Sequence, residues 1–454
     1  MKRLYALLLC LLLLCACKPT PTEEAVINRA DGTLEKAIMQ QPVDPYTYEA
    51  PTRWEETTKI RNQEVRFSAD IEVPDATQFP VVTIRQHAFT PDDITAFLQA
   101  VCTGDWAFRE NELNREELTV ELKKAAKGAY MGDDEETGEP IFQPMEEEMK
   151  RIQGLIEQAP VEDTFVPLDP ARLAEPFKSA RCLRDSSGSL WYFHHISFEG
   201  SGETISIARY RDGMIQMENW IMQGEATPGE KAHALENVVI TDADAVAQAD
   251  AVTAAIGLKN FGVADTQKAR WIQDYFFTVY GEGCWMTSVQ TLPGASPCFY
   301  SESSDPVFTS WALEEQSSNT FAPPWRQEHV QMFITENGLQ FLAWGQPKET
   351  VMTANENVQL LPFAEIQKDL LKLIEFCVGN SENSPILVKR IVLTAAIAQI
   401  PDQGDEAFLV PTWAFFMTTE EYEAQHVDMQ VLLINALDGT YICRSSHLDG
   451  LPSM

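Results

Sequence analysis

The sequence lacks an excess of basic residues: it contains 68 Asp and Glu against 34 Lys and Arg, so 454 residues carry a net charge of −34. Nucleic-acid-binding surfaces need clustered basic residues to displace counterions, and this composition argues against one. The same charge argues against electrostatic attraction to anionic lipid. With 44% hydrophobic residues the chain can still bury a core, and at roughly 100–200 residues per domain its length allows about two to four domains.

Motifs of several catalytic chemistries are also absent. The sequence contains no nucleophile elbow, H-E-x-x-H motif, P-loop or dinucleotide fingerprint. His194 and His195 are adjacent, but neighbours in a strand face opposite sides of a sheet and could not easily bind one ion. With 68 acidic residues, closeness in sequence cannot identify a glycosidase pair. We therefore expect no catalytic residue, no metal ligand and no cofactor, and keep an envelope hydrolase with unrecognised carboxylates as the alternative.

The cysteines do not form a closely spaced set. Residues 17–454 contain no C-x-x-C, which excludes a thioredoxin-like redox motif and a zinc ribbon. Cys284 and Cys298 could close a loop worth ~3 kcal/mol if they paired without strain. Buried free thiols are an equally open interpretation for all six cysteines that follow Cys17, which are Cys102, Cys182, Cys284, Cys298, Cys377 and Cys443.

The first residues have the pattern of an export signal. Met1-Lys2-Arg3 precedes an apolar run from Leu4 to Leu14, which is too short to cross a bilayer as a helix. Leu14-Cys15-Ala16-Cys17 resembles the bacterial lipobox, in which a small residue precedes the modified cysteine. We expect residues 1–16 to be removed and Cys17 to carry diacylglycerol, so that lipid holds the protein on the outer face of the cytoplasmic membrane. An ordinary secretory signal is the alternative.

The stretch from Lys18 to about Arg61 is rich in Pro, Thr and Glu. We expect residues 17–60 to comprise the lipidated cysteine, a tether and a leader. An N-terminal lobe is expected at 61–228, with strands at 65–71 and 79–84. Thr90-Pro91 and Asn114 with Glu117 are typical helix starts, and the third helix carries Met145, Met149, Ile152 and Ile156 at helical spacing. Strands are then expected at 191–198, 204–210 and 214–222, the last two joined by Asp212-Gly213.

A C-terminal lobe is expected at 229–454 and contains two similar units. The first has a helix from Thr241 to Ile256, strands at 274–280 and 284–291, and a hairpin at 329–344 about Asn337-Gly338. The second has a helix at 363–377 and strands at 387–398, 408–417 and 431–441. Helices that alternate with antiparallel meanders predict an α+β fold with two lobes, in which helices back antiparallel sheets. No βαβ alternation is present.

An acidic run lies between the second and third helices, at 133–139 (DDEETGE). It could bind calcium or a cationic peptide. However, it lacks the alternating ligands, central glycine and final glutamate of an EF-hand. We therefore favour a solvated loop.

The last sixty residues resemble a known type of domain. LVPTW at 409–413 and LINALDG at 433–439 are similar to the "PxW … INAxDG" strand pair of PepSY-like domains and of YycH/YycI-type extracytoplasmic proteins of Gram-positive bacteria. The layout of lipobox, acidic body and this ending also resembles uncharacterised lipoproteins of clostridia-like Firmicutes. The resemblance implies a helix-backed sheet and, for the YycH/YycI group, modulation of a membrane sensor kinase through protein contacts.

The same residues can be interpreted without that resemblance. Pro411 is expected to open a strand, where a missing N–H is tolerated, and Trp413 is expected to anchor the core. Asn435 and Asp438-Gly439 suit a turn better than a metal site or an acid–base pair.

These observations predict a non-catalytic, lipid-anchored extracytoplasmic protein that binds another membrane or envelope protein or an envelope ligand. Capture of a small solute would need an enclosed pocket, for which the sequence gives no pattern.

Overall fold

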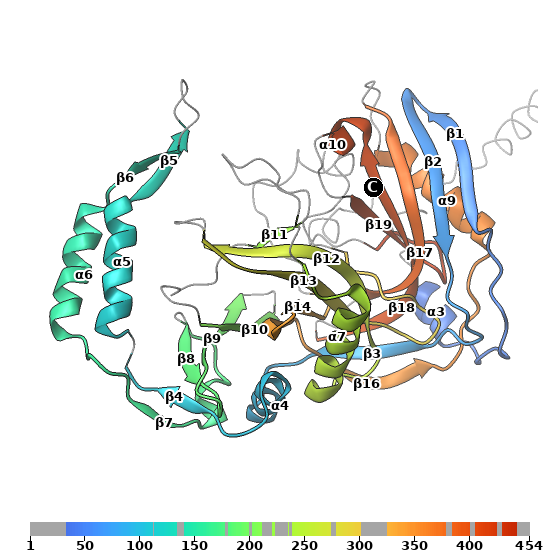
Figure 1. Cartoon of the computed structure of the whole chain (residues 1–454). Coiled ribbons are helices and arrows are strands. Elements are labelled where there is room, and N and C mark those ends of the chain that lie inside the picture. Colours follow the sequence, from blue (N-terminus) through green and yellow to red (C-terminus); the bar gives the residue numbers. More distant parts are fainter. Residues whose placement is uncertain are drawn as a thin grey trace, which may run out of the picture.

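In the computed structural model of the chain, helices pack on two large β-sheets (Figure 1). The structure describes residues 33–442 except 112, 134–139, 178–179, 199–201, 211–219, 223–234, 236–237, 274–277, 301–324, 378–383, 400–404 and 425–428. Both sheets are largely antiparallel and neither closes into a barrel. The fold is therefore of the mixed α+β class that the sequence predicts.

The first sheet, sheet A, combines strands from both ends of the described chain. Its order is β1 (Arg53–Ile60), β2 (Gln63–Glu72), β17 (Ile386–Gln399), β18 (Glu406–Thr419), β3 (Val81–Gln86) and β16 (Lys348–Asn355), and β19 (Gln430–Asn435) also pairs with β18. Neighbouring strands are antiparallel except β2 and β17, which run parallel with Val65 beside Ile386. Sheet A therefore needs residues from the beginning and the end of the chain.

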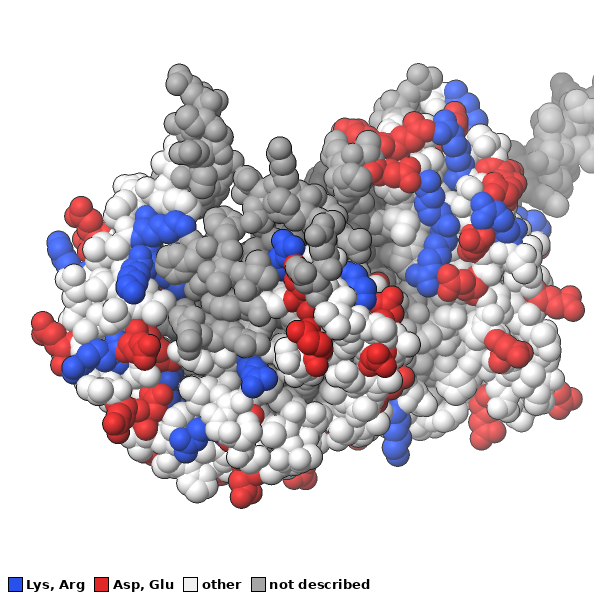
Figure 2. Space-filling view, in the orientation of Figure 1, with Lys and Arg blue, Asp and Glu red and all other residues white. Residues whose placement is uncertain are grey.

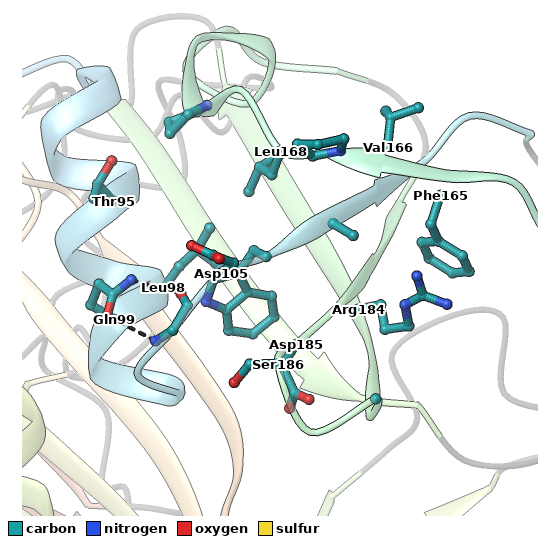
Figure 3. A pocket seen from close by; sticks show the side chains of 16 residues that line it. Thr95, Leu98, Gln99, Asp105, Phe165, Val166, Leu168, Arg184, Asp185 and Ser186 are labelled. Carbon is teal, nitrogen blue, oxygen red and sulfur yellow. Dashed lines mark hydrogen bonds between the residues drawn. The ribbon is translucent and has the colours of Figure 1, made fainter.

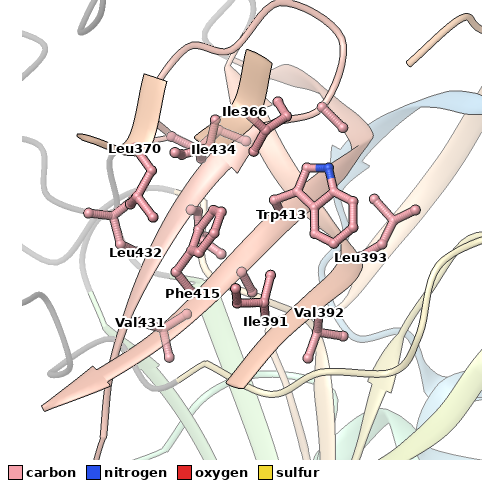
Figure 4. Packing of buried hydrophobic residues seen from close by; sticks show 14 of the residues in the cluster. Ile366, Leu370, Ile391, Val392, Leu393, Trp413, Phe415, Val431, Leu432 and Ile434 are labelled. Carbon is pink, nitrogen blue, oxygen red and sulfur yellow. The ribbon is translucent and has the colours of Figure 1, made fainter. Parts of the chain in front are cut away.

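One helix, α9 (Phe363–Cys377), contributes its predicted apolar face to the core of sheet A (Figure 4). Trp413 is fully buried there, and its ring centroid lies 4.9 Å from that of Phe363. Ile38 of the short helix α3 (Thr33–Ile38) belongs to the same cluster. Trp413 is thus a core residue, as predicted.

The second sheet, sheet B, is built from the middle of the chain. Its order is β11 (Trp220–Met222), β12 (Phe261–Gln273), β13 (Thr278–Gln290), β14 (His329–Thr335), β15 (Gly338–Gly345), β10 (Gly202–Arg209), β9 (Leu190–Phe198), β8 (Arg181–Arg184), β4 (Ala107–Arg109) and β7 (Phe165–Pro167). All of these pairs are antiparallel. The predicted turn at Asn337-Gly338 joins β14 to β15, with Gly338 at a φ of +86°.

Helices α4 (Pro91–Val101) and α7 (Asp242–Ile256) bury their apolar residues in one cluster with sheet B. Both begin where the sequence predicts. Thr90 Oγ1 accepts a hydrogen bond from Asp93 N at 3.2 Å, and the Asp93 carboxylate accepts one from Thr90 N at 2.7 Å. These reciprocal bonds satisfy two otherwise unpaired N–H groups at the start of α4. A single-turn 3₁₀ helix, η1 (Pro170–Arg172), lies beside α4.

Helices α5 (Arg115–Lys127) and α6 (Glu146–Gln158) form an arm with the hairpin β5 (Ala129–Asp133) and β6 (Pro140–Gln143), at the left of Figure 1. The arm has its own small core, which includes Leu118 and Ile152. Glu117 connects α5 to sheet B, because its buried carboxylate accepts two hydrogen bonds from Arg109 Nη1, both at 2.9 Å, and one from Tyr192 Oη at 2.6 Å. The predicted capping of α5 by Asn114 is also present.

The boundary expected at residue 228 does not separate the two sheets. Sheet A takes β1–β3 from one side of it and β16–β19 from the other, and sheet B takes strands from both sides as well. The division into 61–228 and 229–454 therefore does not coincide with the division into sheets.

The C-terminal unit has the predicted order, with α9 followed by the neighbouring strands β17, β18 and β19. Pro411, however, lies inside β18 instead of opening it. On one side of β18, the pairing with β3 ends at Leu409 and the pairing with β19 begins at Thr412. Pro411 therefore falls between two partner strands, where a missing N–H is tolerated. The short helix α10 (Glu420–Ala424) follows β18.

Candidate functional site

An open groove of about 890 Å³ lies where helix α4 meets the β4, β7 and β8 end of sheet B (Figure 3). Helix α4, the segment leading into β4, strand β7 and the turn between β8 and β9 line it. Its lining residues include Thr95, Gln99, Asp105, Trp106, Phe165 and Arg184.

The segment between α4 and β4 is fixed by side-chain contacts. Gln99 Nε2 donates to the carbonyl of Gly104 at 3.0 Å, and Trp106 Nε1 donates to the carbonyl of Cys102 at 3.3 Å. Gly104 has a φ of +124°, a conformation that favours glycine. A Cβ at this position would lie 2.7 Å from Ser186 Oγ. This wall of the groove is therefore formed before any ligand arrives.

The turn between β8 and β9 is organised by Asp185, which is buried. Its carboxylate accepts hydrogen bonds from Ser187 N at 2.8 Å, Ser189 N at 2.9 Å and Trp191 Nε1 at 2.9 Å. Burial alone would raise the pKa of Asp185, but these hydrogen bonds and one from the Ser187 hydroxyl outweigh it and lower the pKa. Asp185 is thus an ionised structural residue whose oxygens are already engaged.

Arg184 supplies a positive charge to the groove. Its exposed guanidinium lies 4.1 Å from the centroid of the Phe165 ring. In the described part of the chain it forms no ion pair. By contrast, contacts with a carboxylate are present at Arg53, Arg66, Arg85, Arg109, Arg151, Arg270 and Arg390.

Charged side chains are interspersed over the visible face of the molecule (Figure 2). On β1 and β2, for example, Arg53 pairs with Asp70 at 2.6 Å. Such pairs neutralise one another locally. Arg184 and Arg172 are exposed arginines for which the described part of the chain supplies no such ion pair.

A second group of titratable side chains lies where the two sheets are joined, but it is buried. Glu328 is 2% exposed, and its carboxyl accepts a hydrogen bond from Trp344 Nε1 at 2.9 Å. Burial raises the pKa of Glu328 to about 7, although this hydrogen bond and the charges of Lys348 and His87 oppose the change. Burial also lowers the pKa of the adjacent His329.

His195 is another buried group near this junction. Its Nδ1 lies 2.9 Å from the carbonyl of Leu173, and its Nε2 lies 3.2 Å from Glu203 Oε2. The Glu203 carboxylate also accepts a hydrogen bond from Phe89 N at 3.0 Å. Burial lowers the pKa of His194, which precedes His195 in the chain. Neither histidine lines the groove.

The structure does not test the expected lipidation, because residues 1–16 and Cys17 lie outside the described residues. The same holds for most of the acidic run at 133–139. None of the helices in the described segments is long and apolar enough to cross a membrane. Within the same segments, no three His, Cys, Asp or Glu side chains are placed to hold a metal ion.

Four cysteines that the structure describes form no disulfide: Cys102, Cys182, Cys284 and Cys298. The pairing of Cys284 with Cys298, one of the two interpretations of the sequence, is therefore not formed. Cys284 Sγ instead lies 3.3 Å from Lys268 Nζ.

The C-terminal polar residues form a turn, as predicted. Asn435 Oδ1 accepts a hydrogen bond from Leu437 N at 2.9 Å, and Asp438 Oδ1 accepts one from Thr440 N at 3.0 Å. Gly439 has a φ of +75°.

The sequence did not predict the groove. Trp106, Phe165 and Arg184 come from three separate segments, and no local pattern links them. The only local signal was the turn-forming DSSG at 185–188.

Comparisons with known proteins leave the function open. No protein-family model matches the chain, and no curated protein matches it. A solved structure of an uncharacterised protein from Eubacterium rectale is similar, with 10% sequence identity and a TM-score of 0.43 over 92% of this chain and 99% of that one.

Proposed function

We propose that the protein is an exported, lipid-anchored binding protein on the outer face of the bacterial cytoplasmic membrane. Cys17 would carry the anchor, and the groove between α4 and the end of sheet B would hold a protein or envelope ligand without chemical conversion. The lipobox-like sequence supports the anchor. The resemblance to PepSY-like and YycH/YycI-type domains supports a regulatory role with a membrane or envelope protein as the partner.

The observation that carries the binding function is the chemistry of the groove. A hydrolase that works through two carboxyl groups needs a cleft in which their pKa values are shifted in opposite directions. Asp185 lines the groove with a lowered pKa, but its oxygens are engaged in the turn. Glu328 has the raised pKa, yet it is buried at the junction of the sheets and does not line the groove. This separation favours binding over hydrolysis.

Photo-crosslinking in the native membrane tests the proposal. A photoreactive amino acid would replace Thr95, an exposed residue of the groove, in the full-length lipoprotein. A matched probe would replace Glu116, an exposed residue of the arm. We expect a discrete adduct from Thr95 but not from Glu116, and release of the Cys17→Ala variant from the membrane.

Identical adducts at both positions, or none at either, would contradict binding in the groove. Retention of Cys17→Ala in washed membranes would contradict the lipid anchor. Breakdown of an envelope polymer by the purified protein would favour the hydrolase instead.

A further inference from the structure

Arg184 has no ion-pair partner among the residues that the structure describes, although acidic residues outnumber basic ones by two to one in the sequence. Its neighbour in sequence, Asp185, is committed to Ser187, Ser189 and Trp191 and forms no ion pair with it. Asp105 is the exposed acid of the groove, and it too has no ion-pair partner among the described residues. In Figure 3, Asp105 lies toward α4, whereas Arg184 and Phe165 lie farther from that helix. The groove therefore has an acidic side and a basic side.

The guanidinium of Arg184 is oriented before any ligand binds. Its contact with Phe165, at 4.1 Å, holds the planar group against the ring without using its N–H donors. Less conformational entropy is then lost when those donors bind an anion. A planar guanidinium can donate two parallel hydrogen bonds to one carboxylate.

Apolar side chains also line the groove, beside the polar Thr95, Gln99 and Ser186. Leu98 on α4, Trp106 before β4, and Val166 and Leu168 around β7 all line it. These side chains suit the apolar side chains of an extended polypeptide. They would make poor contacts with a hydrated phosphodiester polymer. Such a polymer carries many negative charges, so a protein with a net charge of −34 would repel it more strongly than a ligand with one carboxylate.

We propose that the groove binds an extended peptide and that Arg184 holds a carboxylate of that peptide, either an Asp or Glu side chain or the C-terminus. The peptide would lie over the apolar walls between Arg184 and Asp105. This inference rests on the proposed function, in which the groove is the binding site, and adds the chemical class of its ligand.

Selection from a library of random heptapeptides with free C-termini tests the inference, with the full-length protein in detergent as the target. We expect the selected sequences to bind through a carboxylate. Replacing it by an amide should weaken binding roughly tenfold or more, because a charge-assisted hydrogen-bonded pair is lost. Arg184→Gln should weaken the parent peptide to a similar extent and should leave the amide analogue nearly unaffected.

Arg172→Gln is the matched control. Arg172 is also an exposed arginine over an aromatic ring, that of Phe108 at 4.0 Å, but it does not line the groove. The variant makes the same charge change, so we expect it to retain peptide binding. Equal losses in both variants would show a general charge effect and overturn the inference.

The inference would also be overturned if no peptide is selected, if the selected peptides lack a required carboxylate, or if inorganic phosphate or glycerol phosphate binds through Arg184 while peptides do not. In each of these cases a specific adduct from Thr95 would still leave the binding function in place. Loss of the Thr95 adduct in the membrane, with peptide selection unaffected, would instead count against the proposed function alone.

Discussion

Glu328 should make the stability of the protein depend on pH in a way that one substitution removes. The carboxyl is buried beside Trp344, and its pKa in the folded protein is raised from 4.5 to about 7. Below pH 4.5 the group is protonated in both the folded and the unfolded state. Between pH 4.5 and 7 the unfolded chain releases the proton while the folded protein retains it, so the free energy of unfolding falls as the pH rises.

The expected size of this effect follows from the pKa difference. Each pKa unit corresponds to about 1.4 kcal/mol, so the folded protein should lose about 3 kcal/mol of stability from this group between pH 4.5 and pH 8. Glu328→Gln keeps the shape and the acceptor for Trp344 Nε1, but it cannot ionise. The free energy of unfolding of the variant minus that of the wild type should therefore rise by about 3 kcal/mol from pH 4.5 to pH 8. Any effect of the amide that does not depend on pH leaves this change unaltered.

Urea unfolding of both proteins at pH 4.5, 6 and 8 measures this difference directly. Glu336→Gln, at the exposed turn between β14 and β15, is the control for a general loss of one negative charge. Parallel pH profiles for the wild type and Glu328→Gln would refute the reasoning. The same change in slope in Glu336→Gln would do so as well.

Two further substitutions test the architecture. Glu117→Gln should destabilise the protein by roughly 3 kcal/mol in urea unfolding, because it removes the closer countercharge of the buried Arg109 guanidinium and leaves only Asp163, at 3.5 Å. The neighbouring exposed Glu116→Gln should change stability by less than about 0.5 kcal/mol, and similar losses in both variants would refute this role of Glu117. Gly439→Ala should lower the free energy of unfolding by about 1–3 kcal/mol, because the φ of Gly439 is +75° and a Cβ there would lie 2.2 Å from Asp369 Oδ2. An unchanged midpoint of thermal unfolding would contradict this interpretation.

Local signals predicted the helices well. The Thr90 and Asn114 caps and the apolar spacing of residues 363–377 each act within one or two turns, so the sequence around them suffices. Strands with a regular pattern, such as β2 and β14, were also predicted.

Strands at exposed or irregular positions were missed. β16 lies at the edge of sheet A and is mostly exposed, so its sequence lacks alternation. β12 contains Asp265, Gln267 and Lys268, and these polar residues hid a strand of 13 residues. The order of strands in each sheet depends on contacts between distant segments and could not be predicted from local patterns.

The groove was missed for the same reason. Trp106, Phe165 and Arg184 come together only because β4 pairs with both β7 and β8. The aromatic contact that orients Arg184 therefore depends on tertiary structure, whereas the turn at Asp185 could be anticipated from its residues.

The parallel pairing of β2 with β17 has a consequence for the biogenesis of the protein. The edge of β2 that contains Val65 stays uncovered until β17, which contains Ile386, has been synthesised. All strands of sheet B, by contrast, lie within residues 107–345. During synthesis from the N-terminus we therefore expect sheet B to assemble first, while β1, β2 and β3 remain an unfinished layer with an open edge. Such an edge can pair with other chains. Folding should accordingly be slow, because the entropy of closing the long loop between β2 and β17 is lost before their contacts form. A chaperone that shields β2 should raise the yield of folded protein.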